Sequence, residues 1–507
     1  MAAKRLTHTI RLADDGRYGL VRFRAADLDR LEKHVFQRYP EWEWGTFFKF
    51  GWTRTPWGVA MTYVEPILPG PGDLDRQTGM TTFRDQYSRR AFQEAAGQKG
   101  IAVGVVHSHP AGYYTSPSPL DDDMDEYFSR ELAARAGGAP YLSLILERSA
   151  RSGLSFSGRV FDRGDWLPVR ELLAVGPRLD RWRSALLFGE SEPVFDDHET
   201  TARLRALMGE ASARRLRRAT VGVIGCSGTG SPAIHVLARA GVGEFVLVDP
   251  EMFSPSNLER LHGSYFRHVG EQPLKVDLMR DLILDINPSA RVTTFVGNVL
   301  QENVVHELLR CDILLGCVDT YHGRVALSDL AAHYLLPSID VGIGMSGGEG
   351  RVREQVVDVT RFSPDLPCAF CRERVDAAEL ARELMTDEER AHRQAAAARA
   401  TERGDDPDQY WKNRPRALHT VGYLTTAAGA MVAGYTEGWL TGAFDMPHDS
   451  FQFDIAQPRL GCAAPPQSRK TGCRCGNLLG WADAAKSYRN VALPSHWPAR
   501  ALLRFRS

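Results

Sequence analysis

The sequence predicts an α/β protein in which a Rossmann-like domain follows a mixed α+β domain. In the first third of the chain, short apolar runs of strand length alternate with two amphipathic segments of helix length, which favours one sheet covered by helices. From residue 219 onward, the run ATVGVIGCSGTGSPAIHVLARAGVGEFVLVDP has the order strand, Gly-rich turn, helix and strand. Its strands are almost continuously apolar, as parallel strands buried on both faces are, so this part predicts a βαβ unit.

Composition indicates a soluble globular protein. The 507 residues suffice for two or three domains, and 43% hydrophobic with 25% charged residues is an ordinary balance. A formal net charge of -1 leaves no basic excess, so we expect no nucleic-acid partner. The chain has no long apolar run of membrane-spanning length and no apolar stretch near its start. We therefore expect a cytoplasmic protein with no membrane partner.

Motifs and composition divide the chain into domains. Residues 1–165 carry the strand-like runs WGTFFKFGW, GVAMTYVEPIL, IAVGVVHSHP, YLSLILERS and LSFSGRVFD, which predict the α+β domain. Residues 166–200 are expected to be a connector, and residues 201–490 the second domain. Within the latter, the polar, Ala- and Arg-rich stretch 378–416 is interpreted as exposed helix plus a mobile crossover loop. Residues 491–507 remain as a C-terminal tail.

The Gly-rich turn is a candidate nucleotide site. Gly225, Gly228 and Gly230 follow a strand and precede a helix, where glycines let the backbone approach phosphates and the helix N-terminus favours anions. Asp249 ends the next strand, where an acidic residue can hold ribose hydroxyls. These residues alone fit NAD and ATP equally well.

The residues that follow favour ATP. Asn257 and Arg260 lie in SNLERLHG, Lys275 lies in GEQPLKVDLM, and Asp319 ends the later strand DILLGCVDT. A hydride-transfer enzyme has no need of an Arg and a Lys just past the ribose acid. An adenylating enzyme uses such cations to hold the polyphosphate while a carboxylate attacks the α-phosphorus, and an acid such as Asp319 can hold Mg²⁺.

In order and spacing, the run from Val221 to Asp340 resembles the ThiF/MoeB/ubiquitin-activating-enzyme superfamily. The resemblance implies a ThiF-type adenylation domain in which Asp249 binds ribose and Asp319 binds Mg²⁺ and the nucleotide. It implies further that the phosphates are held by Asn257, Arg260 and Lys275. It also implies a homodimer in which an Arg preceding the first strand reaches across to the partner. Arg203 or Arg205 occupies that place, and either can equally be an ordinary surface residue.

Cysteines predict a structural metal site in the second domain. Cys368 and Cys371 form PCAFC, and Cys473 and Cys475 form GCRCG. Two close pairs far apart in sequence are typical of a zinc ion held by four thiolates. The ThiF superfamily often carries such a site as two CxxC pairs, so the CxC pair here is a departure.

Some superfamily members also use a thioester cysteine in the crossover loop, and this chain has none there. Cys462 is the candidate that remains outside the tetrad and the predicted strands. Cys226, Cys311 and Cys317 lie in or beside strands and are expected in the core.

The first domain carries a second metal motif, GVVHSHPAGYYTSPSPLDDD. His107 and His109 alternate at a strand end, so their side chains share one side, and Ser118 and Asp121 follow a Pro-rich loop. Two His and one carboxylate leave a fourth zinc position open for water, as hydrolysis requires. A surface His pair beside an acidic helix start is the alternative.

This motif resembles that of JAB/JAMM metallopeptidases, HxHP followed by SxxD, with one additional residue in the loop between them. The resemblance implies a cytidine-deaminase-like α+β fold with one catalytic zinc ion. It also implies an upstream Glu as general base, for which Glu43 is preferred, followed by Glu41 and then Glu65. Ser118 would stabilise the oxyanion.

Together the motifs predict an enzyme that adenylates the C-terminal glycine of a ubiquitin-like protein and also carries a zinc isopeptidase. The resemblance suggests a bacterial ubiquitin-like conjugation or defence system, in which a conjugating enzyme is a possible partner. The alternative is activation of a sulfur-carrier protein for thiocarboxylate formation in biosynthesis. An NAD-dependent oxidoreductase and a non-catalytic scaffold are the other classes we considered, and Arg260 with Lys275 argues against the former.

Overall fold

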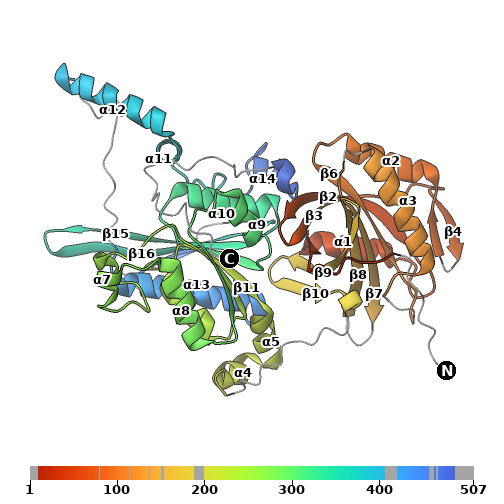
Figure 1. Ribbon diagram of the computed structural model, residues 1–507, viewed down its shortest axis with the longest axis horizontal. Helices are drawn as coiled ribbons and strands as arrows, with labels where there is room; N and C mark the ends of the chain where they lie inside the picture. Colours follow the sequence, from red (N-terminus) through yellow and green to blue (C-terminus); the bar gives the residue numbers. More distant parts are fainter. Residues whose placement is uncertain are drawn as a thin grey trace.

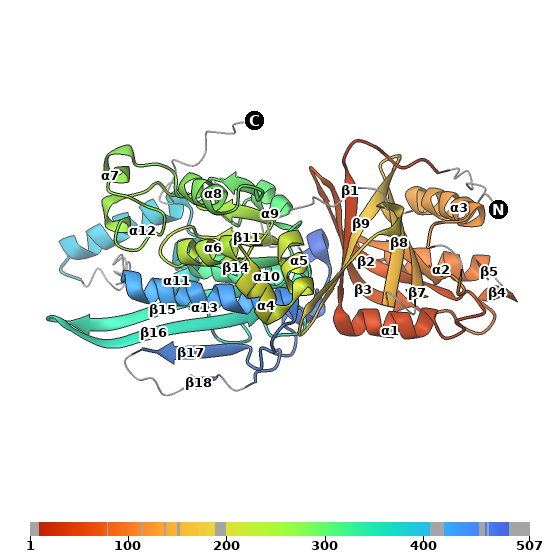
Figure 2. The same ribbon diagram turned by 90° about the horizontal axis from the view of Figure 1, so that it is seen from below.

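The computed structural model describes residues 10–78, 80–112, 115–135, 138–149, 153–187, 199–405, 420–455, 462–463 and 466–485. Two sheet-containing domains lie side by side in both views (Figures 1 and 2). Among these residues, no helix combines the length and the apolar character needed to cross a bilayer. The predicted tail at 491–507 lies outside the described residues.

The first domain is built on a sheet that closes on itself. Its strand order is β1-β3-β2-β6-β7-β8-β9-β10, and β1 also pairs in parallel with β9. Closure leaves a ring of paired strands whose interior holds aromatic and aliphatic side chains such as Phe48, Phe156 and Val160. The strands are β1 (Tyr18–Arg24), β2 (Gly45–Thr55), β3 (Gly58–Ile67), β6 (Ile101–Ser108), β7 (Tyr141–Ser149), β8 (Gly153–Asp162), β9 (Asp165–Val175) and β10 (Leu179–Arg183), with a separate hairpin of β4 (Leu74–Thr78) and β5 (Met80–Phe83).

Three helices cover this sheet. Helix α1 (Ala25–Val35) buries Leu28, Leu31 and Val35 in the same core as β1 and β3. Helices α2 (Asp85–Ala96) and α3 (Pro119–Arg135) pack on the other side of β2 and β6, where Phe92 and Phe128 meet Phe47. Helices α1 and α3 correspond to the two predicted helical segments, whereas α2 was not predicted.

The predicted connector at 166–200 is wrong in its first half. Residues 165–183 form β9 and β10, which belong to the first sheet, and a 3-10 turn follows at Ala185–Leu187. The reason is non-local, because β9 is paired by β1 as well as by β8 and β10. β9, with the sequence DWLPVRELLAV, does not alternate regularly between polar and apolar residues, so it gives no periodic signal of such pairing. Residues 188–198 lie outside the described part of the chain.

The second domain has a mixed sheet of order β13-β12-β11-β14-β15-β16-β17-β18. The predicted βαβ unit is present, with β11 and β12 parallel and one helix between them. Pairing is parallel from β13 to β15 and antiparallel from β15 to β18. The strands are β11 (Thr220–Ile224), β12 (Glu244–Val248), β13 (Arg291–Phe295), β14 (Ile313–Gly316), β15 (Ser338–Gly348), β16 (Arg351–Phe362), β17 (Ser450–Asp454) and β18 (Cys462–Ala463).

Helices cover both faces of this sheet, as a doubly wound fold requires. One core lies under α6, α8 and α13, and the other lies under α9 and α10. The β15–β16 hairpin and α12 both extend from this domain away from the first one (Figure 1). The helices are α4 (Ala202–Met208), α5 (Glu210–Arg218), α6 (Gly230–Arg239), α7 (His268–Glu271), α8 (Lys275–Ile286), α9 (Glu302–Leu308), α10 (Tyr321–His333), α11 (Ala377–Glu383), α12 (Asp387–Glu402), α13 (Gly422–Thr441) and α14 (Arg474–Asn477).

The two domains share a buried interface. The Arg22 guanidinium, which has no solvent exposure, donates to the carbonyl oxygens of Leu309 and Cys311 at 2.7 and 2.8 Å. The indole N–H of Trp439 donates to the carbonyl of Gly176 at 3.0 Å. Each of these bonds joins residues of different domains, so the domains pack as one unit rather than as independent bodies on a linker.

Candidate functional site

A pocket of about 930 Å³ opens at the carboxyl ends of β11, β12 and β14. This edge is where the strand order reverses direction in a doubly wound sheet, and ligands bind there in such folds. All but two of the residues predicted from sequence to bind the nucleotide line it. The lining residues among them are Gly225, Gly228, Asp249, Asn257, Arg260, Lys275 and Asp319.

Each of the three positions requires a glycine for a different physical reason. Gly225 has φ +94, and a Cβ there would lie 2.5 Å from the carbonyl oxygen of Cys317. A Cβ at Gly228 would lie 2.9 Å from Cδ of Arg260, so this glycine leaves room for the Arg side chain over the loop. Gly230 is outside the pocket lining, and a Cβ there would overlap the carbonyl oxygen of Gly225. Gly230 therefore serves the tight turn.

Asp249 is held by the backbone at the end of β12. Its Oδ2 accepts the N–H of Cys226 at 2.7 Å, and its Oδ1 accepts the N–H of Glu251 at 2.8 Å. Burial raises the pKa of Asp249, and Lys275 opposes that shift. Lys275 itself is buried and pairs with Glu251. The acid, the cation and the Gly-rich loop therefore form one connected cluster.

Asn257 and Arg260 stand on the turn after β12. Asn257 is buried, and its Oδ1 accepts the N–H of Ser254 at 2.9 Å, closing a capping box around a 3-10 turn. Arg260 lies one turn later, against Gly228. Asp319 is exposed at the end of β14, two residues before α10 begins. The pocket lining thus contains both the cations Arg260 and Lys275 and the carboxylate of Asp319.

Sequence reasoning missed the wall formed by the crossover stretch. Helices α11 and α12 occupy 377–402, and their residues Arg382, Glu383 and Arg390 line the pocket. Glu383 accepts the backbone N–H groups of Tyr321 and His322 at 3.0 and 2.9 Å.

The described part of the crossover stretch thus contains the predicted exposed helix, as α11 and α12. The prediction did not include the docking of α11 on the first turn of α10 through Glu383. No local pattern reveals such a contact between distant helices. Residues 406–416 of that prediction lie outside the described part of the chain.

Three further predicted residues stand apart from the pocket. Arg203 is exposed on α4, and Arg205 on the same helix pairs with Glu210 at 3.6 Å. Cys462 lies in β18, opposite Gln452 of β17, and its side chain is outside the described part of the structure. A thioester role for Cys462 stays a prediction.

The other cysteines divide as the sequence suggests. Burial raises the pKa of Cys226, Cys311 and Cys317, which disfavours a thiolate nucleophile at any of them. The structure brings the two predicted pairs together: Sγ–Sγ distances are 3.7 Å for Cys368–Cys473, 3.8 Å for Cys371–Cys475 and 3.5 Å for Cys473–Cys475. Thiolates about 2.3 Å from a tetrahedral zinc ion lie about 3.8 Å apart, so the four sulfurs fit such an ion.

In the first domain, the predicted histidine pair and Asp121 also converge. The Nε2 atoms of His107 and His109 lie 3.3 Å apart, and they are 3.1 and 3.6 Å from the two Asp121 oxygens. Ligands about 2.1 Å from a tetrahedral zinc ion lie about 3.4 Å apart, so this trio also fits. Burial pushes the pKa of Asp121 upward, but His107 holds it well below its usual range. The carboxylate is therefore ionised, as a metal ligand must be.

Glu43 lies on the same side as the histidines. Gly45 pairs with His107 between antiparallel β2 and β6, and the Ser108 N–H donates to the Trp44 carbonyl at 2.9 Å. Continuing this register sets Glu43 across from His109, and residues opposite each other share a face. Burial lowers the pKa of His107, but Asp121 and, more weakly, Glu43 raise it overall, so the Glu43 charge is near.

The two competing glutamates are less well placed. Glu41 is exposed in the turn before β2. Glu65 pairs with Lys49 at 2.9 Å on a part of β2 remote from the histidine pair.

Ser118 caps the helix that carries Asp121. Its Oγ accepts the N–H of Asp121 at 3.3 Å, and its own N–H donates to Asp121 Oδ2 at 2.6 Å. These bonds orient the carboxylate toward the histidines. Its predicted part in oxyanion stabilisation stays a prediction.

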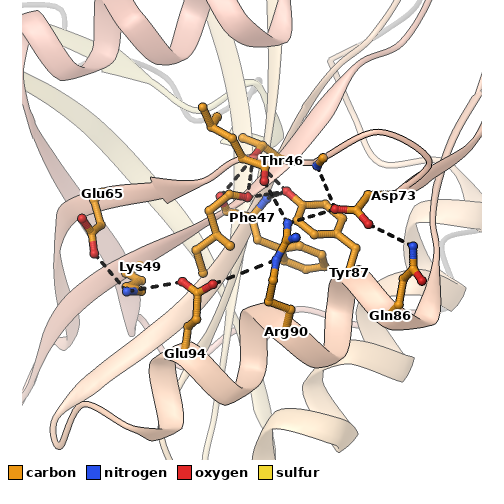
Figure 3. Close-up of polar contacts among 12 residues, drawn as sticks. Thr46, Phe47, Lys49, Glu65, Asp73, Gln86, Tyr87, Arg90 and Glu94 are labelled. Carbon is orange, nitrogen blue, oxygen red and sulfur yellow. Dashed lines mark hydrogen bonds and ion pairs between the residues drawn. The ribbon is translucent and has the colours of Figure 1, made fainter.

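A polar network fixes α2 to the start of β2 (Figure 3). The Tyr87 hydroxyl contacts Thr46 Oγ1 at 3.0 Å and accepts the Phe47 N–H at 3.1 Å. Burial raises the pKa of Tyr87 to about 12, so the hydroxyl stays protonated. Arg90, one turn along the helix, pairs with the buried Asp73 at 2.9 Å. The strand that begins beside the histidine pair is thus bonded to α2 at Thr46 and Phe47.

Comparison with curated proteins finds relatives that share part of the chain. The adenylyltransferase and sulfurtransferase UBA4 of Candida glabrata is 30% identical over 157 residues, which are 31% of this chain and 34% of that protein. The same-named protein of Saccharomyces cerevisiae is 31% identical over 165 residues, 32% and 35% of the two chains. The match thus spans about a third of the length of these relatives.

Solved structures of E. coli MccB are also similar. The complex with ATP is 16% identical and covers 54% of this chain and 73% of that chain at a TM-score of 0.40. The microcin C7 biosynthetic enzyme MccB with N-formylated MccA is 14% identical and covers 55% and 76% at a TM-score of 0.42. At such TM-scores the likeness supports no inference of its own.

The family comparison covers the second domain from its start to the last cysteine of the tetrad. The ThiF family model matches residues 200–475. This range contains the Gly-rich loop, every residue that lines the pocket and all four tetrad cysteines. Because the match includes more than half of the 507 residues, the chain belongs to the ThiF family.

Proposed function

We propose that this chain uses ATP to adenylate the C-terminal carboxylate of a small ubiquitin-like protein. The observation that carries the proposal is the pocket at the ends of β11, β12 and β14, lined by Asp249, Arg260, Lys275 and Asp319. A site for this reaction needs a ribose acceptor, cations for the polyphosphate and a carboxylate for Mg²⁺, and these side chains supply all three.

In this reaction a carboxylate oxygen of the substrate attacks the α-phosphorus of ATP, forming an acyl-phosphate bond as the bond to pyrophosphate breaks. Arg260 and Lys275 would bind the phosphates and stabilise the leaving pyrophosphate. Asp319 would hold a Mg²⁺ ion, which supplies charge neutralisation when bound. Asn257, fixed by its capping box, would orient the nucleotide.

The acceptor of the activated carboxylate has two candidates. Conjugation to a target protein is one, and a conjugating enzyme would then be a partner. Thiocarboxylate formation on a sulfur carrier is the other, and the name of the UBA4 relatives as adenylyltransferase and sulfurtransferase favours it. Mass spectrometry of the product distinguishes them, because a thiocarboxylate replaces one oxygen by sulfur and a conjugate adds the mass of a second protein.

The adenylation proposal is tested by exchange of pyrophosphate into ATP. Wild-type chain should catalyse exchange only when a small protein ending in Gly-Gly is added. Asp319→Ala should lower exchange by about 10²-fold or more, the scale of losing one electrostatic contact to the transition state. Asp285→Ala, an exposed carboxylate on α8 outside the pocket, is the matched control. Equal exchange by the two variants would remove the assignment.

We further propose that the first domain holds zinc and hydrolyses the bond after the modifier's C-terminal glycine. The support is the convergence of His107, His109 and Asp121 beside Glu43. The trio would hold a zinc ion, which polarises water when bound. Glu43 would take the proton from that water as general base and pass it to the leaving amine.

The peptidase proposal is tested by separating the two activities. Glu43→Gln should keep the metal but slow cleavage of a C-terminally extended modifier by about 10²–10⁴-fold, the usual cost of losing a general base. Glu41→Gln is the matched control on the same segment. His107→Ala should lose both the metal and the cleavage. All three variants should retain pyrophosphate exchange with the trimmed modifier. Wild-type cleavage by Glu43→Gln, or slow cleavage by Glu41→Gln, would exclude Glu43 as the base.

Two structural roles complete the proposal. The cysteine tetrad would hold a second, structural zinc ion, because its sulfur spacing fits one. The chain would also act as a homodimer in which an Arg from α4 reaches the partner's pocket. Arg203 suits that role better than Arg205, since Arg203 is exposed and Arg205 has an ion pair with Glu210.

A further inference from the structure

Ser108 lies between the two histidines of the first domain, and none of the roles described so far uses it. Successive residues of a strand point to opposite faces, so its side chain is directed away from His107 and His109. It is fully buried, with no solvent exposure. A hydroxyl in such a place must find hydrogen-bond partners, and they show what it does.

The two partners of Ser108 bracket one segment of the chain. Its Oγ donates to the carbonyl oxygen of Val35, the last residue of α1, at 2.7 Å. The same Oγ accepts the backbone N–H of Trp44, the residue before β2, at 3.3 Å. Between these two contacts runs the segment 36–44, which carries Glu43.

The strand beyond this segment is already fixed by other contacts. Thr46 and Phe47 are held by Tyr87 of α2 (Figure 3). The segment 36–44 forms no helix or strand. Its middle is held by Tyr39, which donates to the Arg148 carbonyl, and by the Pro40 carbonyl, which accepts the Ala111 N–H. Trp44, the neighbour of Glu43, is held by Ser108. One hydroxyl supplies an anchor at both ends, from a residue whose neighbours on either side are the histidine ligands.

We propose that Ser108 is a positioning residue that holds Glu43 at the reacting distance from the site formed by His107 and His109. This inference rests on the proposed hydrolytic function of the first domain. It explains why a serine stands between the histidines. Its backbone sets the spacing of the two ligands, and its side chain holds the segment that carries the general base.

Loss of the hydroxyl should displace Glu43 without unfolding the domain. In Ser108→Ala the backbone bond from the Ser108 N–H to the Trp44 carbonyl, at 2.9 Å, remains. The Trp44 N–H and the Val35 carbonyl lose their buried partner, so the segment between them relaxes. Because a displacement of about 1 Å can cost about 10²-fold in rate, we expect a loss of about 10–10²-fold.

The experiment compares Ser108→Ala, Glu43→Gln and the double variant in the full chain. The matched control is Ser88→Ala, which removes a buried hydroxyl that bonds only within α2. The first readout is cleavage of ubiquitin carrying a C-terminal 7-amido-4-methylcoumarin. We expect Ser108→Ala to lower kcat by the factor above with KM within about twofold, because substrate binding is untouched. In the Glu43→Gln background the second substitution should cost nothing further, since its effect passes through Glu43.

The second readout needs no turnover. The chain is loaded with Co²⁺, and the spectrum of His107→Ala is subtracted to remove the contribution of the cysteine tetrad. Ser108→Ala should bind one Co²⁺ at the histidine site and shift its visible bands as Glu43→Gln does, and the double variant should match the single ones.

The outcomes are distinguishable. Full kcat in Ser108→Ala, loss of its Co²⁺, or an additive effect in the double variant overturns the positioning role. If the wild-type chain binds Co²⁺ but cleaves nothing, the hydrolytic function fails, and the spectra still decide the inference: a Ser108→Ala spectrum identical to wild type overturns it.

Discussion

At the scale of single residues, the Gly-rich loop shows how similar sequence positions carry different constraints. Gly225 faces backbone: a Cβ would meet the carbonyl of Cys317, which cannot move without disturbing β14. Gly228 faces a side chain, because a Cβ would meet Cδ of Arg260. An Arg side chain can rotate away, but it would then leave the place from which it would contact phosphate in the proposed reaction.

The two glycines should therefore fail in different ways. We expect Gly225→Ala to lower the free energy of unfolding by about 2 kcal/mol or more, since it combines a positive φ with a backbone clash. Gly228→Ala should keep nearly wild-type stability but weaken ATP binding by about tenfold through the displaced Arg260. Urea unfolding and nucleotide titration measure the two effects. Equal loss of stability in both variants would contradict the distinction.

At the scale of elements, the segment that follows the cysteine tetrad contacts both domains. The chain leaves Cys475 through α14 and reaches a 3-10 turn at Ala482–Ala485. On the way, the Gly480 carbonyl accepts a bond from Thr62 Oγ1 of β3 at 2.6 Å. Asp483 receives the Tyr334 hydroxyl at 2.8 Å, and Ala482 joins Ala60 in one hydrophobic cluster. The strap 478–485 therefore lies between the two domains.

If the tetrad holds the proposed zinc ion, loss of that ion should release this strap. Wild-type chain should contain about two zinc ions, and Cys473→Ser should lose one while His107→Ala loses the other, by the ligand counts of the two sites. Trypsin should then cut faster near Arg469–Arg474 in Cys473→Ser than in His107→Ala, because only the former loses the anchor. Zinc analysis and timed proteolysis measure both. Equal cutting in the two variants would mean that the strap does not depend on the tetrad.

At the scale of the whole molecule, the hydrophobic core crosses the domain boundary. Val175 and Leu179, at the end of β9 and the start of β10, belong to the same cluster as α6 and α13 of the ThiF domain. Trp439 of α13 is 1% exposed in that cluster and bonds to the carbonyl of Gly176. Domains that share a core and buried hydrogen bonds unfold together when the interface energy rivals their own stability.

Weakening this interface should therefore lower the stability of both domains. Trp439→Phe removes the bond to Gly176 and leaves a small void, at a cost of about 1–3 kcal/mol. We expect the thermal midpoints of both domains to fall together, with Leu207→Ala, an 83% exposed side chain, as a neutral control. Calorimetry gives the overall transition, and loss of the Co²⁺ spectrum at the histidine site reports the first domain. A first-domain midpoint that does not move would show that the domains unfold independently.

The features that depend on local spacing could be predicted from the sequence. The βαβ unit followed from apolar runs around Gly225 and Gly228, because parallel strand, tight turn and helix impose their pattern within a few tens of residues. Motif spacing identified the histidine pair and the two cysteine pairs as candidate metal ligands. In the structure, the ligand atoms of each group lie within 4.8 Å of one another. Strand alternation even gave the correct side for the histidines.

The features that join distant segments could not be predicted from the sequence and became visible in the folded chain. Closure of the first sheet by β1 and β9, docking of Glu383 on the first turn of α10, and burial of Arg22 against the carbonyls of Leu309 and Cys311 left no periodic trace in the sequence. The physical reason is common to all three. A hydrogen bond between segments far apart in the chain depends on how the whole fold brings them together, whereas hydrophobic period and motif spacing report only what neighbouring residues impose on each other.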